Sequence, residues 1–365
     1  MYLAVHLAFL ALTYVAPLFR LKNFSGNALP VITLLNEWNR WDTSLYTAIA
    51  QHGYTVRRIA FFPMLPVLER GLAAIVHNPF VAGLIISNLA CLGLFMVLYR
   101  LVSEDFDESA AGRTVLYMAV FPAAFFLAAA YNESLFLLFS VSSFRYMRRG
   151  RWWLAGLAAV GAGLTRSIGV CLVIPFLYEY MHQRGWQARA IRRDIVALLG
   201  IFAGPAVMMV YGAVTYHDYL AFAHAQRFWK RHLSPPWTVF SDAYHILAHN
   251  GALTFVTIHS AIDLGAVLFA LVLLVATFAG PLKLRRDQWS YGFYAATLYL
   301  AVILVPEGGT YPLSSLSRFI LEIFPLFVVL AHRDRQGSIG IYYVTISGSL
   351  LAFMLLQWLS GGWIV

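Results

Sequence analysis

The residues best suited to chemistry in this sequence lie in one polar stretch near the N-terminus. Asp42 follows Arg40 and Trp41, and Tyr46 lies one helical turn further on. A carboxylate held among aromatic rings in a half-dry cleft gains proton affinity, so Asp42 could act as a general base. Asp42 could instead only cap a helix that begins at Thr43, which is a role that aspartate favours. The residue types alone leave both roles open.

Two arginines at the ends of apolar segments, Arg166 and Arg318, are candidates for binding an anion. An arginine at membrane depth is costly unless it meets an anion, and a lipid phosphate would be one. The alternative is a structural ion pair, of Arg318 with Glu322 one turn on and of Arg166 with Glu133. We expect both arginines to bind phosphate, with Arg40 as a third candidate.

Nothing in the sequence indicates a metal site. His245 and His249 have helical spacing, but two histidines without further placed ligands are a weak signal. Cys91 and Cys171 both lie inside apolar segments, which supports neither a disulfide framework nor a thiolate metal site. We therefore expect no metal and no other cofactor.

The elements that must position these residues are membrane helices. Of the residues, 60% are hydrophobic and only 12% are charged, with a mean hydropathy of +0.69, and one aqueous core could not cover so many apolar side chains. The net charge of +9 could suggest nucleic acid, but most positive charges fall in short loops, where they act as topology signals. The sequence predicts an all-α, multi-pass membrane protein with a single domain, residues 1–365, and no nucleic-acid partner.

About eleven apolar segments are candidates for transmembrane helices. They span residues 2–19, 80–99, 114–130, 133–147, 152–165, 167–181, 195–215, 256–279, 290–305, 319–331 and 338–359. Arginine clusters precede and follow the stretch 152–181, so we expect it to enter the membrane and turn back at Arg166. The charge pattern leaves two long loops, 20–79 and 216–255, on the extracytoplasmic side. The first loop contains short amphipathic stretches that predict interfacial helices, with Glu69 and Arg70 facing water.

Several motifs, in the same order along the chain, resemble those of the PIG-V-like mannosyltransferases, the family of glycosylphosphatidylinositol (GPI) mannosyltransferase II and its prokaryotic relatives. The matching stretches are Arg40-Trp41-Asp42, Gly53-Tyr54, Ala60-Phe61-Phe62-Pro63-Met64-Leu65-Pro66, Tyr131-Asn132-Glu133-Ser134-Leu135-Phe136, Gly163-Leu164-Thr165-Arg166-Ser167-Ile168-Gly169 and Ser317-Arg318-Phe319. Phe319 stands where the family usually has tyrosine. The long loops expected of a eukaryotic member are lacking, which favours a prokaryotic relative.

The resemblance implies a GT-C-type fold and a membrane glycosyltransferase. Such an enzyme takes a hexose, here mannose, from a polyprenyl-phosphate donor and gives it to a glycolipid or glycan acceptor outside the cytoplasm. The phosphate leaving group needs no strong acid, so a single carboxylate, Asp42, can serve an inverting displacement as its base. The implied location is the cell membrane, surrounded by membrane lipids, or the endoplasmic reticulum membrane in a eukaryote.

Six residues are candidates for contacting the sugar or the rest of the substrate. They are Trp41, Tyr46 and Glu133, and from the second long loop Trp229, His232 and Trp237. Glu133 could orient sugar hydroxyls, although capping the following helix is the commoner role of such an acid. The second loop interleaves basic and aromatic residues, which favours a lid over the donor.

A secondary transporter or lipid flippase is the main alternative, because it would also be multi-pass with buried arginines. Transporters tend to have matched halves with interrupted helices at corresponding positions, and this sequence shows no such repeat. They also need no long outer loop centred on an acid. We therefore favour the glycosyltransferase.

Overall fold

A computed structural model describes residues 1–19, 31–251, 253–280, 283–308, 313–334 and 337–362. The α-helices are α1 (Tyr2–Val15), α2 (Val31–Asn36), α3 (Asp42–His52), α4 (Met64–Val76), α5 (Pro79–Asp105), α6 (Glu108–Ala119), α7 (Glu133–Arg148), α8 (Trp152–Thr165), α9 (Val173–His182), α10 (Ala203–Tyr216), α11 (Ala221–His224), α12 (Thr238–His249), α13 (Phe255–Phe278), α14 (Trp289–Leu304), α15 (Leu316–Leu321), α16 (Phe324–Arg333) and α17 (Ser338–Leu359). Short 3-10 helices extend several of them, notably η4 (Ser167–Leu172) before α9 and η6 (Arg193–Phe202) before α10.

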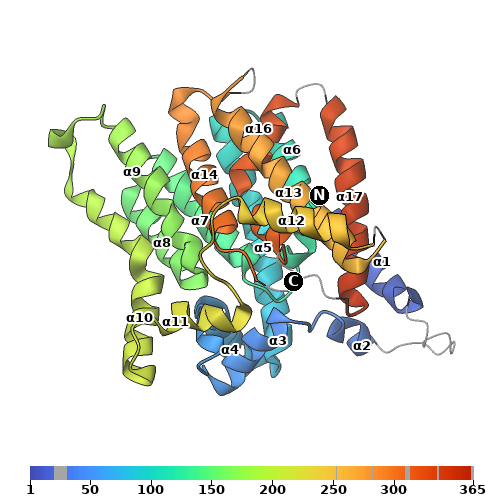
Figure 1. The fold of residues 1–365 in the computed structure, drawn as a ribbon. Helices are drawn as coiled ribbons and strands as arrows, with labels where there is room; N and C mark the ends of the chain where they lie inside the picture. The colour runs from blue at the N-terminus through green and yellow to red at the C-terminus, as the bar shows by residue number, and fades with distance from the viewer. Residues whose placement is uncertain (20–30, 252, 281–282, 309–312, 335–336, 363–365) are drawn as a thin grey trace.

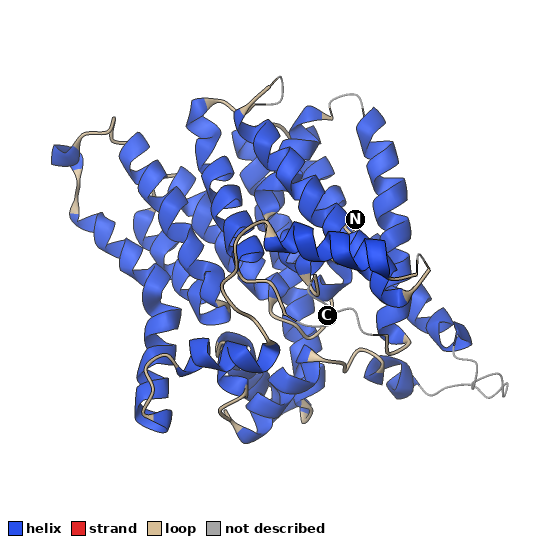
Figure 2. Cartoon of the chain, in the orientation of Figure 1, coloured by secondary structure: helices blue, strands red, loops and turns tan. Residues whose placement is uncertain are grey.

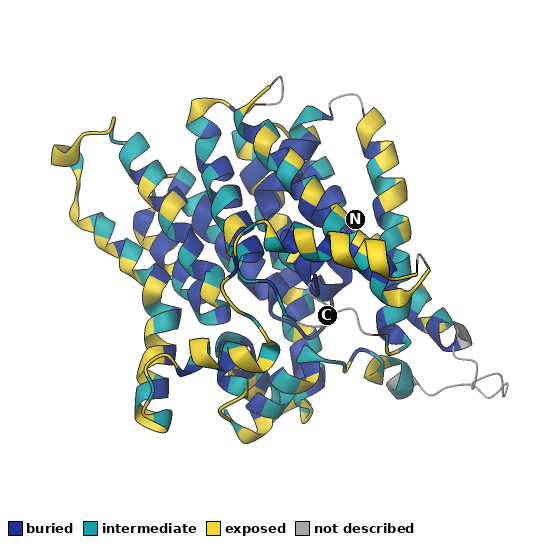
Figure 3. Ribbon diagram, in the orientation of Figure 1, coloured by how far each residue is buried: buried dark blue, intermediate teal, exposed yellow. Residues whose placement is uncertain are grey.

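The described chain is helical throughout, as the composition predicts. Figure 2 draws helices and loops only, and the one extended pairing among the described residues is a single antiparallel bridge between Arg231 and Glu307. The long helices run side by side in one bundle (Figure 1). Buried residues fill the middle of that bundle and exposed residues lie on its periphery (Figure 3). The all-α prediction is confirmed.

Four spans in the described residues are long and apolar enough to cross a membrane by themselves. They are Pro79–Asp105, Arg193–Tyr216, Phe255–Phe278 and Ser338–Leu359. Each of the eleven apolar segments contains a helix, but many of these helices are short; α1 and α8 have 14 residues each. A multi-pass chain is supported, and the count of eleven crossings stays a prediction.

The short helix α8 is followed by the expected turn. Helix α8 ends at Thr165, Arg166 is extended, and η4 begins at Ser167. The chain folds back closely, because a Cβ on Gly169 would lie 2.8 Å from the backbone nitrogen of Gly163. Only a residue without a side chain fits there, so this glycine permits the turn that carries Arg166.

One expected helix is interrupted. The segment 114–130 is helical only as far as Ala119, and a buried irregular stretch with one short 3-10 turn follows. Pro122 lacks a backbone N–H and disfavours helix at the residue before it, which explains the break. Side chains of α5 satisfy the freed backbone: Ser87 Oγ donates to the Tyr131 carbonyl (2.9 Å) and Asn88 Nδ2 to the Ala128 carbonyl (2.9 Å). The break thereby delivers Tyr131 to the end of the bundle.

The short helices of the first long loop gather at one end of the bundle, at the bottom of Figure 1, together with α11. The opposite end, at the top, holds the basic ends of α9 and α16. In α4, Arg70 is exposed as expected, but the prediction for Glu69 is wrong, because its side chain is fully buried. A Cβ on Gly83 of α5 would lie 2.4 Å from Glu69 Oε1, so this glycine makes the room that the carboxyl occupies.

Candidate functional site

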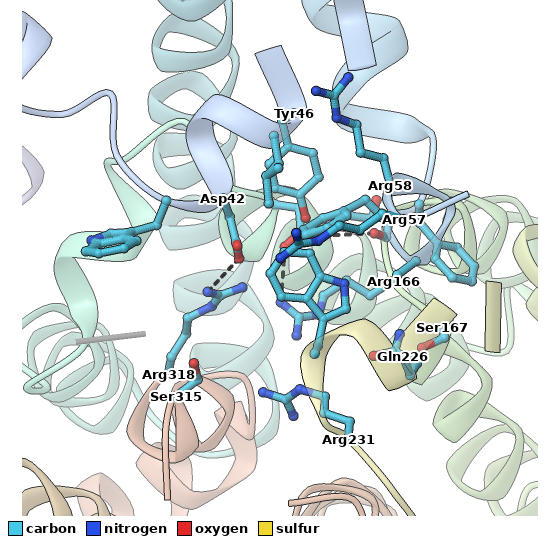
Figure 4. A pocket seen from close by; sticks show the side chains of 18 of the residues that line it. Asp42, Tyr46, Arg57, Arg58, Arg166, Ser167, Gln226, Arg231, Ser315 and Arg318 are labelled. Carbon is cyan, nitrogen blue, oxygen red and sulfur yellow. Dashed lines mark hydrogen bonds and ion pairs between the residues drawn. The ribbon is translucent and has the colours of Figure 1, made fainter. Parts of the chain in front are cut away.

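A cavity of about 640 Å³ opens at the end of the bundle where α3 and α11 lie. Its wall combines carboxylates, guanidinium groups, aromatic rings and amides. The lining residues are Trp41, Asp42, Ser44, Leu45, Tyr46, Thr55, Arg57, Arg58, Ala60, Phe61, Phe62, Asn132, Thr165, Arg166, Ser167, Gln226, Trp229, Arg231, Glu307, Ser315, Arg318 and Phe319. Figure 4 shows Asp42 and Tyr46 reaching in from α3, and Arg318 and Arg231 from the opposite side.

Asp42 is the first residue of α3, and its backbone N–H donates to the Tyr131 hydroxyl at 3.2 Å. Trp41 before it has a positive φ of 50°, unusual for a residue with a side chain, where the chain turns into the helix. The Asp42 carboxylate is directed across the cavity, where Oδ2 lies 2.9 Å from Arg318 Nη1. This placement favours a role at the cavity over simple capping of the helix.

Arg318 lies between two carboxylates. Besides Asp42 it contacts Glu133, with Nε 2.5 Å from Glu133 Oε1, and its guanidinium stands 4.8 Å from the centre of the Tyr131 ring. Glu133 is fully buried at the start of α7. A buried carboxylate is stable only when it is paired, so Arg318 and Glu133 hold each other in place.

Arg166 repeats this arrangement one step further from Asp42. Its Nη1 lies 2.8 Å from Glu133 and 2.8 Å from Glu322, and it donates to Asn132 Oδ1 at 3.1 Å. The structural pairing of Arg166 with Glu133 weighed above therefore occurs, whereas Glu322 pairs with Arg166 and not with Arg318. Asp42, Arg318, Glu133, Arg166 and Glu322 therefore form one row in which three carboxyl groups alternate with two arginines.

Arg231 is a third cavity arginine, which the motif analysis missed. It precedes a short stretch that pairs with the end of α14, where the Ser234 N–H donates to the Leu304 carbonyl (2.8 Å). Its guanidinium lies 4.8 Å from the centre of the Phe319 ring, which Arg166 and Arg318 also face, at 5.1 and 5.6 Å. Enclosure in the cavity wall lowers the pKa of Arg231 to about 10, and Glu307 opposes this shift.

Aromatic rings form another wall of the cavity. Trp229 packs edge-on against Phe61 (ring centres 5.4 Å apart) and carries Arg57 over its face (5.0 Å). Tyr46 packs edge-on against Phe61 from the other side (5.2 Å), and Trp41 lines the same cavity. Burial raises the pKa of the Tyr46 phenol, so this hydroxyl stays neutral. Flat apolar faces beside polar groups suit the two kinds of surface that a sugar presents.

Four of the expected site residues do not line the cavity: Glu133 is buried and paired with Arg318 and Arg166, and the other three lie apart from it. Arg40 pairs with Glu37 and donates to the Leu359 carbonyl at 3.0 Å. His232 is exposed, and Trp237 is 68% exposed. In the part of the chain that the structure describes, no group of three or more His, Cys, Asp or Glu side chains could hold a metal ion. The expectation that no metal is needed stays a prediction.

Comparison with known proteins agrees with the motifs. Residues 62–212 match the family described as dolichyl-phosphate-mannose-protein mannosyltransferase. The chain is 32% identical to GPI alpha-1,6-mannosyltransferase 2 of Rattus norvegicus over 157 residues, which are 39% of this chain and 32% of that protein. It is 28% identical to GPI mannosyltransferase 2 of Yarrowia lipolytica over 140 residues, 38% of this chain and 39% of the relative. The resemblance to GPI mannosyltransferase 2 is confirmed. The match spans about a third of the length of these GPI mannosyltransferases.

A solved structure shows the fold. The crystal structure of ArnT from Cupriavidus metallidurans bound to undecaprenyl phosphate superposes on 99% of this chain and 76% of ArnT, with a TM-score of 0.56 and 12% identity. This likeness, together with the similarity to GPI mannosyltransferase 2, supports the GT-C-type fold expected from the sequence. At 12% identity it indicates the arrangement of helices and not the substrate.

Proposed function

We propose that this chain is a membrane glycosyltransferase that transfers a hexose from a polyprenyl-phosphate donor to a glycolipid or glycan acceptor. Its similarity to GPI mannosyltransferase 2 favours mannose. The observation that carries the proposal is the Asp42 carboxylate, which lines a cavity large enough for a sugar phosphate and is held in place by Arg318.

Asp42 is the base of the proposed reaction. The acceptor hydroxyl attacks the anomeric carbon, the bond from that carbon to the phosphate oxygen breaks, and the proton passes to Asp42. Oδ2 is engaged by Arg318, so Oδ1 is the oxygen that accepts the proton. The polyprenyl phosphate leaves as a stable anion without an acid catalyst, and attack opposite the leaving group inverts the anomeric configuration.

Other residues of the cavity wall would bind the hexose and the phosphate of the donor. Trp41, Tyr46 and Trp229 offer faces and edges for the hexose, and Glu133 acts by holding Arg318 and Arg166. The guanidinium groups of the cavity supply positive charge for the phosphate. Arg40, His232 and Trp237 are left out of the proposed site because they lie away from the cavity.

The charge distribution supports an extracytoplasmic site in a cell membrane. Arg145 and Arg148 form ion pairs with Glu104 and Asp105, and Arg148 also donates to the Asp287 carbonyl, so these charged loops lie together at one end of the bundle. The cavity lies at the other end (Figure 1). Short basic loops favour the cytoplasm, which leaves the cavity outside.

Reconstitution tests the reaction. Purified protein in nanodiscs would receive polyprenyl-phosphate-mannose carrying labelled mannose and candidate glycolipid acceptors. Native protein should release polyprenyl phosphate and form a product of inverted anomeric configuration, while Asp42→Asn should bind the donor without transfer. Movement of labelled lipid across the bilayer with no product would instead support a flippase.

Cysteine labelling tests on which side of the membrane the cavity opens. A cysteine in place of the exposed Ser44, at the cavity mouth, should react with an impermeant maleimide added outside the cell. The native Cys91 and Cys171 are buried, which keeps the background low. Labelling from the cytoplasmic side alone would contradict the proposed orientation.

A further inference from the structure

We propose that Arg231, together with Arg57 from the same cavity, forms the subsite that binds the phosphodiester of the lipid donor, and that Arg166 and Arg318 serve to hold carboxylates. This inference rests on the proposed function and names the side chains that fix the orientation of its donor.

The distribution of ion pairs separates the cavity arginines into two kinds. Arg166 and Arg318 each contact two carboxylates within 2.9 Å. Within the described residues, Arg231 and Arg57 form no ion pair with a carboxylate. Among the described residues, the guanidinium of Arg231 makes one long hydrogen bond, from Nη1 to the Val305 carbonyl at 3.4 Å. Their guanidinium groups therefore keep donors for a ligand.

Counting charges gives the same answer. Asp42 and Glu133 balance the two positive charges of Arg166 and Arg318, and Glu322 adds a third carboxyl group to the same row. A phosphodiester brought to this row would meet no net positive charge. Arg57, Arg58 and Arg231 carry three positive charges in the same cavity against Glu307 alone. One singly charged phosphodiester is more favourably placed at this second group.

The surroundings of Arg231 suit an anion. Enclosure in the wall opposes its charged form, and an anion within contact distance would offset that cost. Gln226 and Trp229, which precede Arg231 in the chain, also line the cavity, and Arg57 lies over the ring of Trp229. Arginine presents paired N–H groups that match the oxygens of a phosphate.

The assignment orients the donor. With the phosphate at Arg231, the sugar extends along the aromatic wall toward Asp42, which Figure 4 shows on the side of the cavity opposite Arg231. The Asp42 carboxylate then faces the anomeric carbon, where positive charge develops as the phosphate leaves. This arrangement stabilises both charges of the transition state.

The test compares Arg231→Gln with Arg227→Gln, a neutralised arginine on the same segment that is exposed outside the cavity. Two quantities would be measured in nanodiscs: the Kd for undecaprenyl phosphate, and the KM for polyprenyl-phosphate-mannose. Arg231→Gln should raise both by about tenfold or more, because a charge-assisted contact is lost, and Arg231→Lys should fall between it and native. Arg227→Gln should leave both unchanged. If Arg231→Gln does not fold, Arg57→Gln at the exposed mouth gives the second variant, with an increase of about threefold expected in both constants.

Other results would overturn either the phosphate subsite or the proposed function, and the experiment distinguishes the two. Donor constants that stay within about twofold of native in Arg231→Gln would overturn the subsite while native transfer still supports the enzyme. An increase confined to the KM of a phospholipid-linked acceptor would assign the arginine to the acceptor and also overturn the proposal. Binding of undecaprenyl phosphate that depends on Arg231, in a native protein that transfers no sugar, would support the subsite and overturn the proposed function.

Discussion

Asp42 Oδ2 lies 2.9 Å from Arg318 Nη1, and this contact joins the first long loop to the short helix α15 near the other end of the chain. Arg318 also holds the fully buried Glu133, so the position of the proposed base depends on a side chain fixed from behind. A base oriented in this way pays little reorganisation cost when the substrate arrives. The same contact makes the folding of α15 and the activity of Asp42 interdependent.

Replacing Asp42 by asparagine should abolish transfer and preserve the fold. The amide keeps the shape of the side chain and can still accept from Arg318, but it cannot take the acceptor's proton, so kcat should fall by about 10² to 10⁴. The KM for the donor should change little. Asp107→Asn, at an exposed aspartate that caps α6 outside the cavity, is the matched control, because asparagine caps a helix as well as aspartate does. Transfer at native rates by Asp42→Asn would remove the proposed base.

Replacing Arg318 by methionine should destabilise the protein strongly. The variant leaves Glu133 and Asp42 without their shared cation, and breaking a buried pair from one side costs about 3–5 kcal/mol. Arg231→Met should lower the unfolding temperature far less, since Arg231 forms no close ion pair and the carboxylate that it influences, Glu307, is only partly buried. Thermal unfolding in detergent measures both.

A double variant checks the cause of this loss. Adding Glu133→Gln to Arg318→Met removes the buried charge that has lost one of its two cations, so the loss should be smaller than the sum of the two single losses. Equal losses for Arg318→Met and Arg231→Met would show that the pairing with carboxylates is not what matters.

Sequence reasoning located the part of the site that depends on motifs and on the ends of apolar segments. Asp42, Arg166 and Arg318 all line the cavity, as do Trp41 and Tyr46. Each lies in a polar cluster beside a long apolar segment, and such clusters converge where helices of a bundle end. These positions follow from the spacing of hydrophobic segments, which the sequence displays directly.

The features that the sequence does not reveal depend on contacts between segments that are distant in the chain. Arg231 reaches the cavity because the stretch after it pairs with the end of α14, and no periodicity in the second loop announces that pairing. Trp237 lies in the same loop, among similar basic and aromatic residues, and yet its side chain is exposed. Glu69 is buried because Gly83 on α5 leaves space for its carboxyl, which the pattern of α4 alone cannot reveal.

Two tryptophans of the second loop should therefore differ in function. Trp229→Ala removes a ring from the cavity wall that also supports Arg57, and kcat/KM should fall by about tenfold. Trp237→Ala removes a ring that is 68% exposed outside the cavity, so its kcat/KM should stay within about twofold of native. Steady-state kinetics on both variants decides the matter. Equal losses would mean that the second loop covers the donor along its whole length.

Glu69 should make the stability of the protein depend on pH. Both of its carboxyl oxygens are buried without a hydrogen-bond partner among the described residues, and burial raises the pKa of Glu69 to about 9 from an ordinary value of 4.5. The folded protein keeps this proton at pH values where the unfolded chain has lost it. Stability is therefore highest below pH 4.5 as far as this group is concerned, and it falls by about 1.4 kcal/mol per unit between these two values.

Glu69→Gln carries no titrating proton at this position, so its unfolding temperature should decline less between pH 5 and about pH 9 than that of the native protein. Glu108→Gln, at an exposed acid on α6, should follow the native profile. The comparison needs only thermal unfolding in detergent at several pH values. Parallel profiles for native protein and Glu69→Gln would mean that water or a mobile partner reaches this carboxyl and that it ionises without cost to the fold.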